Sequence, residues 1–185
     1  HRHSNRKQSS RQACAEQIRF ENGKFYQAEM TSCGLNDGPL RGKGNYPAYI
    51  ACNLYGKKGT RFLSMLKHPK NGYPFFTQKG GDRENGEDQY IANMCDGAVA
   101  GFKYFDLSKT GAVRINIKGK AEGTVLVRTS EKGETVAEIP VKPCREVHGF
   151  SAKIAGLGEK EALFFSFQGK GAFDFFSFDL KEDRQ

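Results

Sequence analysis

Few side chains of this sequence combine a type and a spacing that could do metal chemistry. His1 and His3 stand two positions apart, and the other histidines are His68 and His148. A free terminal amine with imidazole nitrogens suits Cu(II), so copper binding through His1 and a second histidine, His68 or His148, is one alternative. It needs a processed terminus at His1. Residues two apart share a strand face in any case, so the spacing of His1 and His3 also arises by chance.

The cysteines are widely scattered, and no two of them form a CxxC pair, so the spacing of a zinc site is absent. An odd number of scattered cysteines favours buried free thiols over a disulfide framework. A single bridge is still compatible with this pattern, which leaves both an oxidising and a reducing compartment open. The cysteines are Cys14, Cys33, Cys52, Cys95 and Cys144.

The net charge of +8 is concentrated in the first part of the chain. Residues 1–70 carry 13 Lys and Arg against 4 Asp and Glu, whereas residues 71–185 carry 16 against 17. This asymmetry indicates two units of different origin. The basic run "RKQSSRQ" lacks the interleaved aromatics of a single-strand platform, and no helix-turn-helix or zinc-finger spacing occurs. We therefore expect no nucleic-acid partner, and no stretch is long enough to predict a membrane span.

The pattern of apolar residues predicts an all-β protein. Val113, Ile115 and Ile117 alternate with polar residues over 112–119, which is the period of a half-buried strand. Similar runs recur about every ten residues, as in a sandwich of antiparallel sheets. The predicted strands are 48–55, 101–107, 112–119, 123–129, 134–141, 150–156, 161–168 and 172–180. We expect the phenylalanines of the last two to fill the core: Phe164, Phe165, Phe167, Phe173, Phe175, Phe176 and Phe178.

The start of the chain has a different pattern. Residues 17–30 hold two short alternating runs around Asn22-Gly23, a dipeptide typical of a hairpin turn. The following residues, 32–47, are rich in Gly and Pro, which indicates a linker. The linker is the best candidate for a domain boundary.

The second part of the sequence resembles a family 6 carbohydrate-binding module. The resemblance is carried, in order and spacing, by "GFKYFDLSKTGAVRINIKGKAEGTVLVRT", "ETVAEIPV" and "ALFFSFQGKGAFDFFSF", with Asp96-Gly97 at a turn and Asp174 in the closing strand. It implies a jelly-roll-type β-sandwich of antiparallel strands over residues 47–185.

The first part resembles the end of a family 43 glycoside hydrolase catalytic domain, a five-bladed β-propeller. The segments that carry this are "HRHSN", "SRQACAEQI" and "AEMTSCGLNDGPLRGKGNYPAYIACNL". The resemblance implies that residues 1–46 are a fragment of the last blade, including the hairpin, plus the linker. The chain would then begin inside that blade, and the missing propeller domain would be its partner.

The resemblance places no catalytic residue in this chain. Inverting glycosidases need a carboxylate base and a carboxylic acid, and in family 43 these come from earlier blades. The acids of residues 1–46 are Glu16, Glu21, Glu29 and Asp37, and we expect them to be solvated. The parent would be an arabinofuranosidase or xylosidase acting on arabinose- or xylose-containing plant polysaccharide, and this chain its sugar-binding or propeller-supporting module.

The family's sugar cleft commonly uses a Tyr, a Trp and an Asn. Tyr90 is the candidate for the Tyr, whereas the sequence contains no Trp and only His148 and Phe150 stand near the corresponding position. Ala172 or a neighbour replaces the Asn. Because two of the three elements are missing or replaced, a structural or interaction sandwich that has lost its sugar sites is the main alternative.

A second sugar site of this family lies on a concave sheet face, and Tyr104, Arg114, Asn116 and Lys118 are candidates for it. An aromatic ring stacks on a sugar face while amides and charges bind its hydroxyl groups. The expected ligand is therefore a plant cell-wall oligosaccharide or polysaccharide.

The resemblance also implies a structural calcium ion near the two ends of the module. Asp174 and Asn53 are the oxygen-bearing candidates for its ligands. A polysaccharide-degrading parent favours a secreted or periplasmic location, whereas the unpaired cysteines are compatible with the cytoplasm.

Overall fold

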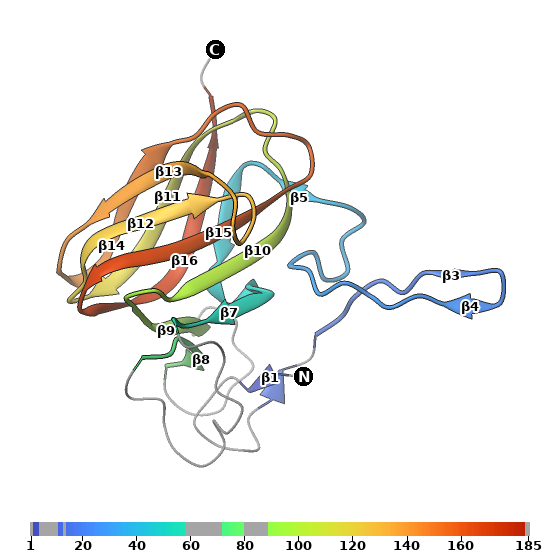
Figure 1. Cartoon of the computed structure of the whole chain (residues 1–185), viewed down its shortest axis with the longest axis horizontal. Helices are drawn as coiled ribbons and strands as arrows, with labels where there is room; N and C mark the ends of the chain where they lie inside the picture. Colours follow the sequence, from blue (N-terminus) through green and yellow to red (C-terminus); the bar gives the residue numbers. More distant parts are fainter. Residues whose placement is uncertain (1, 4–10, 13, 58–71, 80–88, 184–185) are drawn as a thin grey trace.

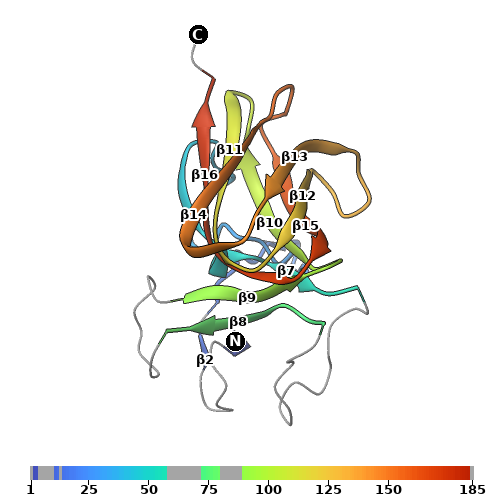
Figure 2. The same cartoon turned by 90° about the vertical axis from the view of Figure 1, so that its left-hand side faces the viewer.

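The computed structural model describes residues 2–3, 11–12, 14–57, 72–79 and 89–183. Two six-stranded sheets pack face to face as a sandwich, and Figure 2 shows the two layers side by side. The only helix among the described residues is the 3-10 helix η1 (Ala48–Ile50). None of these residues forms a helix with the length and hydropathy that a transmembrane span requires. The predicted all-β sandwich is confirmed.

The first layer, called sheet I here, has the strand order β13-β12-β15-β10-β5, and β7 also pairs with β10. Its strands are β5 (Leu40–Arg41), β7 (Asn53–Tyr55), β10 (Val99–Asp106), β12 (Glu122–Arg128), β13 (Thr135–Val141) and β15 (Glu161–Lys170). All pairs are antiparallel except β5 with β10, which is parallel.

The second layer, sheet II, has the order β14-β11-β16-β9-β8, and β6 also pairs with β16. Its strands are β6 (Gly44–Pro47), β8 (Phe75–Gln78), β9 (Gln89–Cys95), β11 (Thr110–Gly119), β14 (Cys144–Lys153) and β16 (Ala172–Glu182). Strands β6 and β9 lie end to end along β16: β6 pairs with residues 177–180 and β9 with residues 172–175.

Aromatic rings fill the core between the sheets. Phe102 of sheet I meets Phe178 of sheet II edge to face, with ring centroids 4.8 Å apart, and Phe165 and Phe175 pack around them. Such edge-to-face packing adds to the stabilisation from burying apolar area. Five of the seven phenylalanines predicted to be in the core lie there: Phe165, Phe167, Phe173, Phe175 and Phe178.

The prediction is wrong for the other two phenylalanines. Phe164 is buried but points to the outer side of sheet I, where its ring lies over Gly101. Phe176 is half-buried on the outer side of sheet II. A register shift between Asn116 and Ile117 leaves one extra residue in β16, and this bulge interrupts the alternation.

The strand predicted over residues 48–55 is only partly present. After Pro47 the chain forms η1, which buries Ala48, and only β7 is extended. Strands β8 and β9 lie between residues 56 and 100, where the sequence pattern predicts no strand. In β9 the alternation that identifies a strand breaks at Asn93, which has a positive φ of 60°.

The predicted hairpin is confirmed. Strands β3 (Phe20–Glu21) and β4 (Lys24–Phe25) pair across Asn22 and Gly23, whose positive φ angles of 50° and 75° suit a tight hairpin turn. The hairpin projects away from the sandwich (Figure 1). Nearer the terminus, β1 (Arg2–His3) and β2 (Arg11–Gln12) form a separate antiparallel pair.

The sandwich begins earlier in the chain than residue 47. β5 pairs with β10, and β6 pairs with β16, so the predicted boundary between residues 46 and 47 falls inside β6. The Gly- and Pro-rich run has the composition of a linker. The two strands within it are only two and four residues long, too short to be identified from the sequence pattern. The origin of the preceding residues in a propeller blade stays a prediction.

Candidate functional site

A row of polar side chains crosses the outer face of sheet II. Asn45, Asp179 and Arg114 are register partners on β6, β16 and β11, and Asn116 and Ser177 are partners in the adjacent row. Register partners point to the same side of a sheet. The alternate residues of β11 are buried in the core, so these five side chains point outward. We call them the polar face.

Asp179 is the centre of this polar face. The amide Nδ2 of Asn45 donates to Asp179 Oδ1 at 2.8 Å, and that of Asn116 donates to Asp179 Oδ2 at 2.9 Å. Both amides also donate to Ser177 Oγ, at 3.1 and 3.0 Å. The network holds two amide groups in fixed orientations on a surface that stays partly exposed. Such preorganised amides and hydroxyls are the groups that bind sugar hydroxyls.

Arg114 lies over a gap in the neighbouring strand. Gly149 of β14 has no side chain, and a Cβ added there would come within 1.8 Å of Arg114 Nε and 2.3 Å of its Cζ. The guanidinium therefore occupies the space that a larger residue at position 149 would fill. It adds a cation with several donors beside the two amides.

An aromatic pair adjoins the polar face. The Tyr90 and Phe176 rings stack with centroids 4.8 Å apart and an interplanar angle of 23°. Lys79 Nζ lies 5.3 Å from the centroid of the Phe176 ring, close enough for a cation–π contact. Because the bulge in β16 places Phe176 on the same side as Ser177, rings and amides share one side of sheet II. Sequence alternation could not find Phe176, because the bulge that turns it outward has no local signal.

The predicted cleft of Tyr90, His148 and Phe150 is not assembled. Tyr90 is in β9, whereas His148 and Phe150 are in β14, and two strands lie between them. At ordinary strand spacing this separates them by about 14 Å. Phe150 packs against the core, and the exposed His148 contacts it with ring centroids 4.9 Å apart. The three residues could share a cleft only if β9 and β14 lay side by side in the sheet.

The predicted calcium ligands are not brought together either. Asn53 pairs with Gly101 on the outer side of sheet I, whereas Asp174 is opposite Lys118 on the outer side of sheet II. The two sheets themselves are about 10 Å apart. Within the described ranges no group of three His, Cys, Asp or Glu side chains could hold a metal ion. This pair does not fit a calcium ion, and calcium held in another way stays a prediction.

Asp174 instead binds the backbone of the neighbouring strand. Its Oδ1 accepts a hydrogen bond from the Asn93 N–H at 3.3 Å. Burial raises the pKa of the Asp174 carboxyl, while the Asn93 bond and the Lys118 charge act in the opposite direction. The group therefore ionises less readily than an exposed aspartate.

Tyr104 lies on sheet I and not beside Asn116, so the two do not form one site. Phe102 and Phe105 of β10 both point into the core, which leaves Lys103 and Tyr104 outside. The Tyr104 hydroxyl donates to Glu29, with distances of 2.9 and 3.1 Å to the two carboxylate oxygens. Lys103 Nζ lies 3.0 Å from the same carboxylate.

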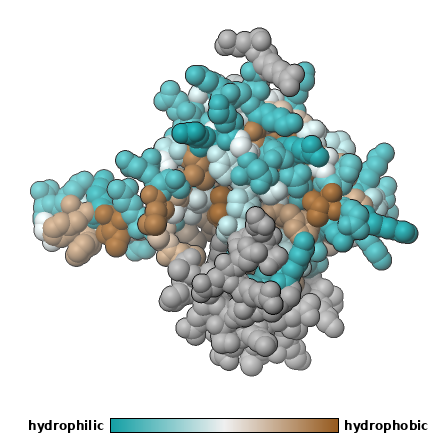
Figure 3. All heavy atoms as spheres, turned by 180° about the vertical axis from the view of Figure 1, so that it is seen from behind, coloured by the Kyte–Doolittle hydropathy of each residue, from teal (hydrophilic) through white to brown (hydrophobic). Residues whose placement is uncertain are grey.

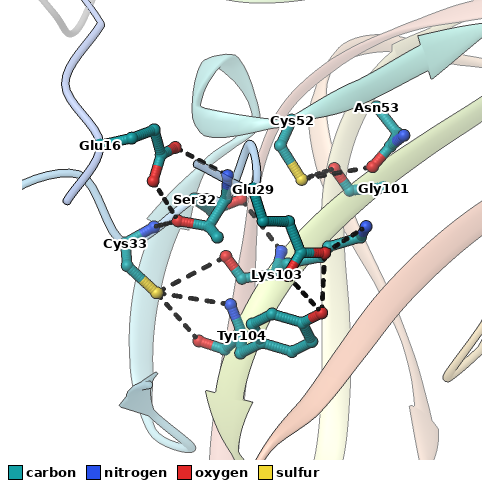
Figure 4. Close-up of polar contacts among 10 residues, drawn as sticks. Glu16, Glu29, Ser32, Cys33, Cys52, Asn53, Gly101, Lys103 and Tyr104 are labelled. Carbon is teal, nitrogen blue, oxygen red and sulfur yellow. Dashed lines mark hydrogen bonds and ion pairs between the residues drawn. The ribbon is translucent and has the colours of Figure 1, made fainter. Parts of the chain in front are cut away.

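The segment around Glu29 is docked on β10 (Figure 4). The backbone of Ser32 donates to the Lys103 carbonyl, and the Lys103 N–H donates back to Ser32 Oγ at 3.1 Å. Cys33 Sγ donates to the Lys103 carbonyl at 3.6 Å and accepts from the Tyr104 N–H at 3.5 Å. We call Glu29, Ser32 and Cys33, with their partners on β10, the clamp.

Two acids expected to be solvated are thus structural. The Glu16 carboxylate accepts from the Thr31 N–H at 2.7 Å and from its hydroxyl at 2.9 Å, which ties the two ends of the hairpin segment together. Hydrogen bonds from Lys103 and Tyr104 lower the pKa of Glu29. The expected solvation holds for Glu29, whose side chain is 53% exposed, whereas Glu16 is half-buried. The sequence did not predict their hydrogen bonds, because the partners lie far away in the sequence or across the hairpin.

All five cysteines are free thiols, as predicted, but the expectation that they are buried is wrong, because Cys14 is exposed and the other four are half-buried. Burial raises the pKa of Cys52 and Cys95, which keeps both thiols protonated and poorly nucleophilic. His1 and His68, on which the copper alternative depends, lie outside the described residues.

Comparison with known proteins agrees with this architecture. No family model matches the sequence. A xylosidase/arabinosidase of Thermoclostridium stercorarium is 43% identical over 185 residues. The match covers 99% of this chain and 39% of that protein, so the chain spans well under half the length of its relative.

Solved structures match at lower identity and show the fold. A family 6 carbohydrate-binding module of Clostridium stercorarium, in complex with cellobiose, has a TM-score of 0.59 at 15% identity, covering 79% of this chain and 98% of its own. The corresponding module of Clostridium cellulolyticum, in complex with xylose, has a TM-score of 0.59 at 14% identity, covering 77% and 100%.

A longer enzyme matches more of the chain. A family 43 arabinoxylan arabinofuranohydrolase of Bacillus subtilis, in complex with cellotetraose, has a TM-score of 0.61 at 14% identity, covering 91% of this chain and 33% of its own. The resemblance found in the sequence is confirmed: the sandwich has the fold of family 6 carbohydrate-binding modules, and the chain as a whole is similar to part of a xylosidase/arabinosidase.

Proposed function

We propose that this chain is a non-catalytic carbohydrate-binding module of a glycoside hydrolase that acts on arabinose- or xylose-containing plant polysaccharide. The observation that carries the proposal is the polar face, where Asn45 and Asn116 are oriented by Asp179 beside an aromatic pair. The 43% identity to a xylosidase/arabinosidase supports the class of the parent enzyme.

The polar face has the chemistry that sugar binding requires. With both Nδ2 groups turned to Asp179, each amide keeps a carbonyl oxygen to accept from a sugar hydroxyl. Arg114 supplies donors, and the exposed part of the Tyr90–Phe176 pair supplies an apolar surface for a pyranose ring. Solved modules of the same fold hold xylose and cellobiose, which makes a β-linked xylan or glucan chain the preferred ligand class.

Calorimetric titration with xylan, arabinoxylan, arabinan and β-glucan oligosaccharides tests this proposal. We expect saturable heat with at least one of them. Asn116→Ala should weaken binding about tenfold, the effect of losing one well-placed hydrogen bond. Gln168→Ala is the matched control, because Gln168 is an exposed amide on the outer side of sheet I. Tyr90→Ala separately tests the aromatic pair.

A sandwich without any sugar site is the competing function. It is favoured by one observation, namely that the predicted cleft is not assembled. Equal losses in Asn116→Ala and Gln168→Ala would show that a bound glycan does not contact the polar face. Absence of heat with every oligosaccharide would favour a sandwich without a sugar site. In that case the module would act only as a structural support of the enzyme.

A further inference from the structure

The projecting hairpin, residues 17–27, has two chemically different faces, and we call it the arm. On one face Phe20 and Phe25 are register partners whose rings lie 4.7 Å apart. Ile18 is on the same face by alternation. The three side chains are 61% (Ile18), 57% (Phe20) and 77% (Phe25) exposed.

The opposite face of the arm is charged and already satisfied within the arm. Arg19 lies 4.2 Å from the centroid of the Tyr26 ring and 3.6 Å from the Glu21 carboxylate. Lys24 is the register partner of Glu21 across the hairpin. The arm is therefore amphipathic across a two-stranded ribbon, with one face suited to water and the other suited to burial.

A ribbon of this kind needs a partner. An isolated two-stranded hairpin is marginally stable in water, and contiguous exposed apolar side chains mark interaction surfaces. Figure 3 shows hydrophobic colour along the arm, on a part of the chain well separated from the core. Met30 and Leu35, nearer the sandwich, are also exposed. None of these groups packs against the core cluster of the described residues.

The base of the arm is held firmly. Glu16 and Thr31 join its two ends, and the clamp binds the following residues to β10. These hydrogen bonds fix the position of the arm relative to the sandwich. A partner that packs on the apolar face of the arm would therefore also be held at a fixed position relative to the sandwich, which a flexible linker would not achieve.

We propose that the apolar face of the arm, formed by Ile18, Phe20 and Phe25, packs against another domain of a longer glycoside hydrolase polypeptide and fixes the sandwich to it. The relative at 43% identity includes the arm in its match, yet only 39% of that protein is matched. Isolated modules of the fold match 77–79% of this chain, whereas the longer hydrolase matches 91%. The inference rests on the proposed function only in placing the chain within a hydrolase.

Tryptic cleavage of the arm tests the proposal directly. The chain alone is compared with a full-length chimera in which this chain replaces the matching part of the Thermoclostridium stercorarium relative. Trypsin cleaves after Arg19 and Lys24, both in the arm. We expect cleavage there to be at least about tenfold slower in the chimera, since burial must be opened before cleavage. Cleavage after Lys132, in an exposed turn between β12 and β13, should proceed equally in both.

Substitutions in the chimera identify the surface. Phe20→Ser combined with Phe25→Ser should restore fast cleavage, whereas Val147→Ser, at an exposed apolar residue of β14, should leave protection intact. Phe20→Leu combined with Phe25→Leu keeps apolar area on the arm and should keep most of the protection. Loss of protection in this pair as well as in the serine pair would show dependence on hairpin stability and not on an apolar contact, which would overturn the proposal.

Two further results would also overturn it. Equal cleavage after Lys24 in the chimera and the chain alone would show that the arm is not covered. Protection of the chain alone that rises with its concentration would assign the arm to a second copy of the chain. Glycan titration of the chain alone tests sugar binding separately from the packing of the arm. If the arm is protected in the chimera but the chain binds no glycan, only the sugar-binding part of the proposed function is contradicted.

Discussion

The outer faces of the two sheets carry similar polar groups but use them differently. On sheet II, Asn45 and Asn116 bind Asp179 from adjacent strands, so the network lies flat and remains open to a ligand. On sheet I, Tyr104 and Lys103 bind Glu29, a residue about 75 positions away in the segment that is docked on β10. Polar residues on an outer strand face therefore do not by themselves indicate a binding surface. The partners decide whether the face is open.

Glycine has opposite consequences on these two faces. Gly101 on sheet I is covered by the buried Phe164 ring, whose Cε1 would lie 2.6 Å from an added Cβ. At Gly149 on sheet II, the three atoms nearest to an added Cβ all belong to the exposed side chain of Arg114. The first ring has little room to move, whereas the second side chain can swing into solvent.

The largest expected effect is therefore on sheet I. Gly101→Val should lower the free energy of unfolding by about 1–3 kcal/mol, because overpacking displaces the Phe164 ring and crowds Asn53. Gly149→Val should cost less than about 1 kcal/mol while displacing Arg114 from the polar face. Urea denaturation followed by circular dichroism measures both. Equal losses of stability would mean that Gly101 and Gly149 are equally closely packed, which would contradict the difference between the two outer faces.

A smaller effect is expected at the clamp. The pKa of Glu29 is lowered by hydrogen bonds from Lys103 and Tyr104, so its folded-state pKa lies below its unfolded one. The stabilisation is then complete above the unfolded pKa of about 4.5 and is lost as pH falls through the folded pKa. Hydrogen exchange of the Ser32 and Tyr104 amides should accelerate in Glu29→Gln at neutral pH, after correction for the intrinsic exchange rate.

Acid should have the same local effect on the wild-type chain, again relative to the intrinsic rate. Glu21→Gln is the matched control, since Glu21 faces Arg19 within the arm and does not touch β10. If Glu29→Gln leaves exchange of both amides unchanged, the Glu29 carboxylate contributes nothing to docking. Its contact with Lys103 would then be a surface ion pair, which contributes little to stability.

The smallest effect has the opposite sign and lies on sheet II. Burial raises the pKa of Asp174, so the folded state binds its proton more tightly than the unfolded state. Ionisation of Asp174 thus opposes folding at neutral pH, and this penalty disappears as pH falls through the raised pKa. Asp174→Asn keeps an acceptor for the Asn93 N–H and should slightly raise the unfolding free energy at pH 7 but not at pH 3. A decrease at pH 7 would show that the Lys118 attraction outweighs burial.

The sequence determined the fold class and much of the strand pattern. The alternation over 112–119 identified β11 because period-2 burial is a local property of a half-buried strand. Asn22-Gly23 identified its hairpin because both residues tolerate positive φ. The order of several such signals also sufficed for the resemblance to family 6 modules, which the fold bears out.

Only the tertiary structure decided which side chains meet. The bulge that turns Phe176 toward Tyr90 depends on the register of β16 against β11. The separation of Tyr104 from Asn116 depends on which sheet each strand joins. Strand pairing is set by the packing of the whole core, so no local pattern encodes it. For this reason the sequence alone named candidates for a sugar site, and the structure alone showed which of them share a face.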